Sequence, residues 1–277
     1  MTIFQRVDRL KAAIDGVRPF EGAMLDEIRG YYRIGLTWSS NAIEGNTLTE
    51  SETKVLLEDG LTAGGKPLRD SFEAIGHAEA YDFMFSLLQS ASISEEDAQT
   101  MHRVFYRNID ESAAGSYRSR AVLITGSNYP VTEPGRIAAE MESLFEWANS
   151  GRGEYHPVEF AAQLHKRFVF IHPFIDGNGR ISRLLMNAAL IQDGYLPAVI
   201  PPILRREYID LLERARTDDR PFAEFIAARV LESEKDMLRL LHIPEPEGCY
   251  DLDEIVSGIT DENGHGEFGW GEDAGKT

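Results

Sequence analysis

Helical periodicity runs through nearly all of residues 1–243 and limits the possible folds more than any other feature. Apolar residues recur at intervals of three and four, the spacing that lines one face of an α-helix. The expected helices span residues 2–15, 21–44, 49–59, 68–90, 94–108, 134–149, 157–171, 180–192, 205–216 and 221–242. Residues 120–125 are the exception, because they are β-prone and precede turn residues 126–128. We therefore expect an all-α bundle with one short β-hairpin; a surface loop is the alternative for that segment.

Capping patterns indicate where several of these helices begin and end. Thr49 stands three residues before Glu52, and Ser94 three before Asp97, the spacing of a capping box. Gly194 follows the segment 180–192, where a glycine commonly terminates a helix. These patterns fix the expected starts of two helices and the end of a third.

One short run of sequence combines the groups needed to handle a polyphosphate. It reads His172-Pro173-Phe174-Ile175-Asp176-Gly177-Asn178-Gly179-Arg180-Ile181-Ser182-Arg183. Residues 177–179 lie where an expected helix begins, and free N–H groups at a helix start attract anions. Arg180 and Arg183 are three residues apart and project toward the same end. Asp176, beside a phosphate site, is a natural ligand for Mg²⁺. A core histidine beside an ordinary glycine loop would not explain the combined spacing.

This run resembles the motif of the Fic family, HxFx(D/E)GNGRxxR, and matches it at every specified position. The similarity extends from about Asp97 to Met237, with weaker likeness through the N-terminal third. The resemblance implies a Fic-type helical bundle and a protein adenylyltransferase. Such an enzyme moves AMP from ATP to a Ser, Thr or Tyr hydroxyl of a target protein.

The resemblance also implies a role for each residue of the motif. His172 would be the general base, and an imidazole with an ordinary pKa near 6.5 can accept a proton at neutral pH. Asp176 would hold Mg²⁺ across the α- and β-phosphates. Gly177, Asn178 and Gly179 would form the anion hole, and Arg180 and Arg183 would neutralise the β- and γ-phosphates. Relatives that transfer the γ-phosphate carry Lys where this chain has Gly179, so Gly179 favours AMP transfer.

A second motif lies at the end of the expected helix 21–44. Ser40 and Glu44 are four residues apart and share one helix face, and Gly45 follows as a helix terminator. Taken alone, this is a helix end with a polar face. Beside the Fic motif it resembles the family's inhibitory motif, (S/T)xxxE(G/N). The resemblance implies that Glu44 pairs with Arg183 and excludes the γ-phosphate, because an arginine–carboxylate pair is strong and directional.

Two further segments complete the site that the resemblance implies. Residues 116–132 correspond to the family's flap, whose backbone edge holds the target by strand addition. Thr125, Gly126, Ser127 and Asn128 match the flap tip near the nucleotide. Residues 205–216 correspond to the wall beside the adenine, where Tyr208 and Ile209 are the candidate contacts. Some relatives have an aromatic residue in place of Ile209 and Asn in place of Arg216, a departure that affects base recognition.

The chain is expected to have three parts. Residues 1–95 form an N-terminal helical region that carries the inhibitory motif, and residues 96–243 form the catalytic core. Residues 244–277 hold ten acidic side chains, one lysine and seven glycines, a composition that buries little and predicts a mobile tail.

Composition sets the remaining limits. A net charge of −18 argues against nucleic-acid binding. No apolar run approaches the roughly 20 residues of a membrane span, and residues 1–8 do not resemble a secretory signal. The single cysteine, Cys249, suits a reducing cytoplasm, where we expect the protein. The implied cofactors are ATP and Mg²⁺, and the implied partner is the target protein; a homodimer is compatible with the family.

Two other functions compete with AMP transfer. In the first, the same fold works as a hydrolase, and Glu44 positions water that removes AMP from a modified protein. In the second, the chain is a non-enzymatic adaptor that binds extended peptides along the flap. An intact base at His172 and metal ligand at Asp176 argue against the adaptor, since a peptide-binding surface needs neither.

Overall fold

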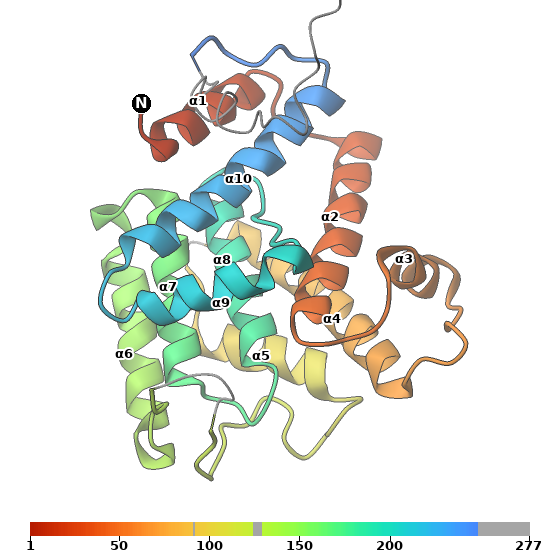
Figure 1. The fold of residues 1–277 in the computed structure, drawn as a ribbon, viewed down its shortest axis with the longest axis vertical. Helices are drawn as coiled ribbons and strands as arrows, with labels where there is room; N and C mark the ends of the chain where they lie inside the picture. Colours follow the sequence, from red (N-terminus) through yellow and green to blue (C-terminus); the bar gives the residue numbers. More distant parts are fainter. Residues whose placement is uncertain (91, 124–128, 249–277) are drawn as a thin grey trace, which may run out of the picture.

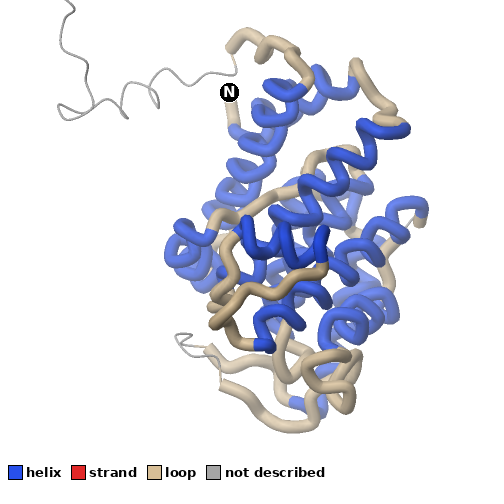
Figure 2. The backbone as a smooth tube through the Cα atoms, turned by 90° about the vertical axis from the view of Figure 1, so that its right-hand side faces the viewer, coloured by secondary structure: helices blue, strands red, loops and turns tan. Residues whose placement is uncertain are grey.

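The structure is a computed structural model that describes residues 1–90, 92–123 and 129–248. Within these residues it consists of helices and loops without strands, as Figure 2 shows. The α-helices are α1 (Ile3–Asp15), α2 (Gly22–Ile43), α3 (Glu50–Asp59), α4 (Leu68–Ser86), α5 (Glu95–Tyr106), α6 (Ile137–Ser150), α7 (Pro157–Ile171), α8 (Asn178–Gln192), α9 (Arg205–Arg214) and α10 (Arg220–Leu240). Four 3₁₀ helices accompany them: η1 (Leu87–Gln89), η2 (Pro134–Arg136), η3 (Arg152–Glu154) and η4 (Pro202–Leu204).

The predicted capping boxes are confirmed. Thr49 Oγ1 accepts from the Glu52 N–H, and the Glu52 carboxylate accepts from the Thr49 N–H. Ser94 and Asp97 make the same reciprocal pair at the start of α5. Gly194 has φ 81°, the left-handed conformation expected just after α8. Local side-chain chemistry therefore sets these helix ends.

Helix α8 lies at the centre of the bundle and is buried on almost all sides. It packs against α7, α4, α5 and α2 (Figure 1). Helix α10 crosses α1 and α7, and α6 covers the outer side of α7. The central position of α8 explains why its first turn can receive side chains from several helices.

One hydrophobic core joins the helices before and after residue 96. Its buried members include Val7 and Leu10 of α1, Leu36 of α2, Phe168 of α7 and Val230 of α10. The large apolar area that these helices remove from water is the main favourable term in holding them together. The helix that carries Ser40 is thereby fixed against the rest of the bundle.

The predicted hairpin is not seen in the described residues on either side of the flap tip. Arg118 explains how that segment is held instead. Its guanidinium donates to the carbonyl oxygens of Arg120, at 3.0 Å, and of Thr132. Because one side chain binds the segments before and after the flap tip, these two carbonyls have hydrogen-bond partners without pairing between strands.

Two other predictions concern regions at the limits of the structure. The tail expected from residue 244 is described only as far as Gly248, where the Glu247 carbonyl accepts from Arg9 at 2.9 Å. Mobility was predicted for the whole of residues 244–277, of which residues 249–277 lie outside the described residues. Among the helices that the structure describes, none has the length and apolar character needed to cross a membrane.

Candidate active site

The loop between α7 and α8 brings the predicted motif to the centre of the bundle. It begins with His172 in the left-handed conformation (φ 54°) and ends with Gly177 (φ 80°), which reverses the chain into α8. The Asn178 side chain closes the loop, since its Oδ1 accepts from the Phe174 N–H and its Nδ2 donates to the Phe174 carbonyl, both at 2.9 Å. The amide of Asn178 is thus used to shape the loop.

His172 lies half-buried at the end of α7. Its backbone carbonyl accepts from Arg118 Nε at 2.7 Å, which ties the flap segment to the loop. Burial lowers the pKa of the imidazole to about 4, and the nearby Arg118 charge acts in the same direction. The ring is therefore neutral at physiological pH. Its Nδ1 makes no hydrogen bond within the described residues, although the Val169 backbone lies close enough to favour the protonated ring.

Asp176 is surrounded by donors. Its Oδ1 accepts from the Gly177 N–H at 2.6 Å and from Arg180 at 2.9 Å, and its Oδ2 accepts from Arg69 at 2.7 Å. Burial opposes ionisation, but Arg180, the Gly177 N–H and Arg69 outweigh it and lower the pKa of Asp176. The carboxylate is ionised and its side chain is 37% exposed.

Arg180 is held between two carboxylates. Its Nη1 lies 3.1 Å from Glu73 and its Nη2 lies 2.9 Å from Asp176, and only 3% of the residue is exposed. Glu73 in turn accepts from Arg69 at 3.0 Å. The charges of Arg69, Glu73, Asp176 and Arg180 thus form one network across α4 and the start of α8.

The sequence analysis did not find Arg69 or Glu73. A signal was present, because the buried residues Asp70, Glu73 and His77 follow one another at intervals of three and four along α4. Polar side chains on the buried face of a helix need partners, and here Glu73 meets the candidate site. The partner of Glu73, Arg180, is distant in sequence and could not be identified from the spacing along α4.

Arg183 is as fully enclosed as Arg180, with 4% of the residue exposed. Its Nε donates to Ser40 Oγ, and its Nη2 donates both to the Ser40 carbonyl and to Glu44 Oε1, each at 2.8 Å. Burial opposes ionisation of Glu44, but Arg183 and Arg180 outweigh it and lower the pKa of the carboxyl. The ion pair that the resemblance implied between Glu44 and Arg183 is therefore present.

Gly179 leaves the space that Glu44 fills. A Cβ atom built at Gly179 would lie 2.2 Å from Glu44 Oε1 and 3.1 Å from Arg183 Nη1. The first distance is far below van der Waals contact. Any side chain at position 179 is consequently incompatible with the observed position of the Glu44 carboxylate.

Tyr208, the candidate contact with the adenine, lies beside Arg183. It is 1% exposed, and its hydroxyl lies 2.8 Å from His165 Nε2 and 3.4 Å from Arg183 Nη1. Because the hydroxyl accepts from Arg183, it donates to His165. Tyr208 thus supports Arg183 from behind, while Ile209 packs partly buried against the core. The predicted flap-tip contacts Thr125, Gly126, Ser127 and Asn128 lie outside the described residues.

His102 of α5 supports the loop from its other side. Its Nδ1 accepts from the Gly115 N–H at 2.9 Å, so Nε2 carries the proton and donates to the Asp176 carbonyl at 3.1 Å. The ring stacks on Phe174 at 3.7 Å between centroids and 2° between planes. Burial lowers the pKa of His102 to about 4, so the ring stays neutral. His102 was not predicted as a site residue, because no sequence pattern within its own helix indicates a role at the site.

The described residues contain no cluster of three or more His, Cys, Asp or Glu side chains suited to a metal. Asp176 alone still fits Mg²⁺, which commonly binds one or two carboxylates and takes its other ligands from water and substrate phosphates. The unpaired N–H groups at the start of α8 are adjacent to this carboxylate. The residues present therefore suit a magnesium–polyphosphate complex better than a metal held by protein alone.

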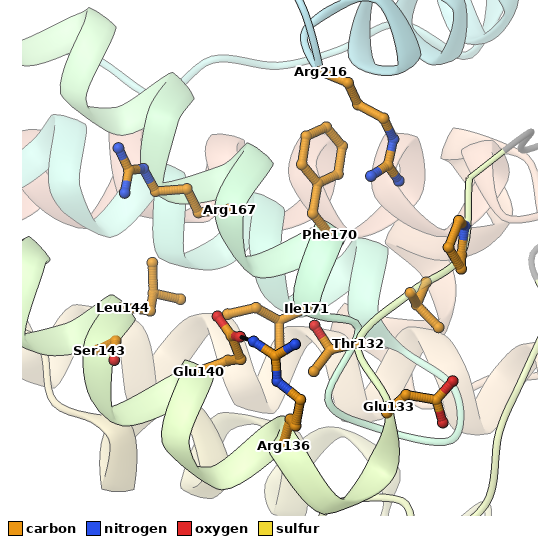
Figure 3. Close-up of a pocket in the computed structure, with 12 residues that line it drawn as sticks. Thr132, Glu133, Arg136, Glu140, Ser143, Leu144, Arg167, Phe170, Ile171 and Arg216 are labelled. Atoms are coloured by element: carbon orange, nitrogen blue, oxygen red, sulfur yellow. Dashed lines mark hydrogen bonds and ion pairs between the residues drawn. The ribbon is translucent and has the colours of Figure 1, made fainter.

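A separate pocket of about 510 Å³ lies between the flap segment, α6 and α7 (Figure 3). Thr132 and Glu133 border it on one side and Phe170 and Ile171 on another. Ile171 directly precedes His172 in the sequence, but His172 itself does not line the pocket.

Comparisons with known proteins agree with this geometry. Residues 92–190 match the family model described as Fic/DOC family. The chain is 36% identical over 226 residues to "Protein adenylyltransferase Fic" of Drosophila yakuba, covering 80% of this chain and 45% of that protein. The protein of the same name from Drosophila persimilis is 39% identical over 193 residues, covering 69% and 38%. The chain thus spans less than half the length of these curated relatives.

Solved structures give the same result. Fic-1 (residues 134–508) from C. elegans superposes with a TM-score of 0.78 at 30% identity, covering 87% of this chain and 72% of that one. A Fic domain containing signaling protein from Bacteroides thetaiotaomicron gives a TM-score of 0.77 at 29% identity, covering 83% and 95%. On the motif, the fold and these similarities, the chain belongs to the Fic/DOC family.

Proposed function

We propose that this chain is a protein adenylyltransferase that transfers AMP from ATP to a Ser, Thr or Tyr hydroxyl of a target protein. The observation that carries the proposal is that His172 and Asp176 share the loop leading into α8, and that His172 lies near Asp176 and near Glu44, the partner of Arg183. A neutral base, an ionised carboxylate and a helix start with free N–H groups are what a nucleotidyl transfer requires. The activity named for the curated relatives supports the same reaction.

In the proposed reaction the target hydroxyl oxygen attacks the α-phosphorus of ATP. A new P–O bond to the target forms, the bond between the α-phosphorus and the α,β-bridging oxygen breaks, and pyrophosphate leaves. His172 accepts the hydroxyl proton, because its ring is neutral and its position next to the loop suits a base. The N–H groups of Asn178 and Gly179 would stabilise the charge that develops on the phosphate oxygens. The Gly177 N–H, also predicted to take part, donates to Asp176 Oδ1 in this structure.

Mg²⁺, when bound, supplies charge neutralisation to the phosphates, and Asp176 would hold it. Arg69 and Arg180 now occupy both oxygens of that carboxylate. Arg69 is 54% exposed and can move aside at little cost, whereas Arg180 is enclosed. Arg180 would keep Asp176 oriented and Arg69 would give way to the metal.

The proposal includes inhibition by Glu44. Its carboxylate neutralises Arg183 and fills the space next to Gly179, where a phosphate would approach the helix start. With Arg183 engaged by Ser40 and Glu44, the γ-phosphate lacks its cation. The N-terminal part, residues 1–95, would then act as the inhibitory part of the protein, and residues 96–243 as its catalytic core.

The experiment is label transfer in cell lysate with ATP labelled at the α-phosphate. The Glu44→Gly protein should label a target at least about tenfold faster than the unchanged protein, since one charge-assisted contact to Arg183 is lost. Glu27→Gly is the matched control, because Glu27 is an exposed residue of the same helix. His172→Ala should abolish labelling in the Glu44→Gly background. Label arriving from the γ-phosphate would contradict AMP transfer.

The hydrolase is a second candidate, and one observation favours it. The Glu44 carboxylate is ionised and 34% exposed at the edge of the site, so it can accept a hydrogen bond from a water. In this version the water attacks the phosphorus of an AMP-modified side chain and the side-chain oxygen leaves. Release of AMP from pre-modified protein, lost in Glu44→Gly, would identify this activity.

A further inference from the structure

The pocket beside the flap carries a charge that the rest of the chain does not suggest. Three arginines line it (Arg136, Arg167 and Arg216) against two glutamates (Glu133 and Glu140). The whole chain has a net charge of −18, so a locally positive pocket is not a general property of its surface. A site that concentrates cations on an acidic protein selects for negative ligands.

Two of these arginines make no hydrogen bond to a carboxylate within the described residues, although Arg216 has an ion pair with Glu213 and Arg167 lies near Asp219. Arg136 pairs with Glu140, as Figure 3 shows. Arg167 stacks over Trp147 at 4.0 Å, and its Nε makes no hydrogen bond. Arg216 lies 3.8 Å from Glu213, too far for a hydrogen bond, and its Nε is likewise unpaired.

Aromatic rings fix the orientation of Arg216. Its guanidinium lies 3.9 Å from the ring centroid of Phe170 and 4.5 Å from that of Tyr129, and its side chain is 16% exposed. Stacking on rings preserves the in-plane N–H groups for hydrogen bonds and limits the entropy lost on binding. Arg167 and Arg216 lie on opposite sides of Phe170 (Figure 3).

The position of the pocket connects it to the target. It is bordered by residues 130–133, which follow the flap tip, and by Ile171, which precedes His172. In an extended segment successive residues advance by about 3.3 Å, so a side chain within about three residues of the reactive hydroxyl can enter it. Planar, stacked arginines recognise carboxylates by paired hydrogen bonds.

We propose that this pocket is a subsite for an acidic side chain of the target segment, bound by Arg216, while Arg167 on the other side of Phe170 adds to the positive potential of the pocket. The inference rests on the proposed function, because it assumes that a target hydroxyl meets His172. It adds a side-chain preference to a mode of binding that otherwise reads the target backbone. The specified ligand is a peptide carboxylate close to the modified Ser, Thr or Tyr.

The test measures peptide binding by fluorescence anisotropy, so that it does not depend on catalysis. Labelled synthetic peptides carry one central threonine and differ only in having Glu, Gln or Lys at a neighbouring position. The Glu peptides should bind the full chain about tenfold more tightly than the matched Gln peptides at one or two positions. Arg216→Gln should remove that difference, and Arg167→Gln should reduce it. Arg206→Gln is the control, because Arg206 is 95% exposed on α9 and outside the pocket.

A charge reversal keeps the test decisive if the glutamine variants lose affinity for structural reasons. Arg216→Glu should prefer the Lys peptide, with an unchanged far-UV circular dichroism spectrum. Equal binding of Glu and Gln peptides by the unchanged chain, or no saturable binding of either, would overturn the proposal. So would weaker binding of a fluorescent ATP analogue in the Arg216 and Arg167 variants with peptide binding unaltered, since that result places the pocket on the nucleotide side.

Failure of the proposed function has a different outcome. In that case the Glu44→Gly chain transfers no label from ATP to any protein, whatever the peptides do. An acidic preference in binding without AMP transfer would support the subsite and reject the transferase. AMP transfer without a preference for acidic peptides would support the transferase and reject the subsite.

Discussion

Ser40 accepts two hydrogen bonds from Arg183, one at its hydroxyl and one at its carbonyl, both at 2.8 Å. The guanidinium is thus oriented by the last turn of α2 even before Glu44 is considered. Glu44 supplies the negative charge that pairs with Arg183, and Ser40 orients the guanidinium group. The predicted inhibitory motif is therefore a two-residue contact with one arginine.

Ser40→Ala should weaken this contact without removing it. One hydrogen bond of about 1 kcal/mol is lost, so AMP transfer should rise about fivefold, less than in Glu44→Gly. Label transfer from ATP measures both. Ser39→Ala is the control, since Ser39 is also buried and makes no hydrogen bond to Arg183 within the described residues. An increase as large as that of Glu44→Gly would show that charge at position 44 is not the main restraint.

Arg69→Ala should lower the Mg²⁺ concentration needed for half-maximal AMP transfer. The exposed Arg69 guanidinium covers Asp176 Oδ2 at 2.7 Å and competes with the metal for that oxygen. Exposed ion pairs are worth less than about 1 kcal/mol, so the expected shift is about twofold to fivefold. Arg107→Ala, which breaks a similarly exposed pair with Glu79, should leave the Mg²⁺ dependence unaltered.

His102→Phe should destabilise the fold by about 2–4 kcal/mol and raise the KM for ATP. The phenyl ring can keep the stacking on Phe174, but the Gly115 N–H and the Asp176 carbonyl lose their partner, and each buried unpaired group is costly. Urea unfolding and steady-state kinetics measure the two effects. His102→Gln retains a donor and an acceptor and should recover part of both; equal damage in the two variants would point to packing alone.

Stability should rise with pH up to about 6.5 and then decline toward pH 9. Burial lowers the pKa of His77 and His165 to about 3 and of His102 and His172 to about 4. Between these values and the unfolded value near 6.5, only the unfolded chain binds the protons, so stability increases with pH. Burial raises the pKa of Glu234 from 4.5 to about 9, so between these values only the folded chain holds this proton and the Glu234 contribution to stability falls as pH rises. Above pH 6.5 the histidine contribution no longer grows, so the Glu234 contribution sets the sign.

Urea midpoints across this range test the sign of each contribution. Glu234→Gln should abolish the alkaline decline, because the group that binds a proton only in the folded state is gone. The acid-side rise should remain, since the four histidines are unaffected. A decline that persists above pH 7 in Glu234→Gln would assign it to other groups.

Sequence patterns predicted the helices almost completely. Helix α7 was expected at residues 157–171 and occupies Pro157–Ile171, because its apolar spacing and the proline at its start are both local signals. The range 68–90 was too long, since η1 takes over after Ser86. The hairpin was the clearest difference: the described β-prone residues 120–123 form no strand, and the Arg120 carbonyl accepts from Arg118.

The candidate site was predictable to the extent that its residues are close in sequence or share a motif. Arg69, Glu73 and His102 come from α4 and α5, and only the packing of these helices on α8 brings them to the loop. The contact of the Tyr208 hydroxyl with Arg183 was likewise not predicted, and the predicted contact of Tyr208 with the adenine stays a prediction. The roles of the site residues remain predictions that the experiments above test.

Glu44 is the C-cap residue of α2, and Gly45 after it has φ 98°. Arg205 Nε donates to the Ile43 carbonyl at 2.6 Å, so this last turn is fastened to α9 as well as to Arg183. The body of α2 is anchored in the core through Leu36 and Tyr32. If only this last turn unwound, the Glu44 carboxylate would leave Arg183 while the rest of α2 stayed in place. Release of Arg183 would therefore require only a local rearrangement.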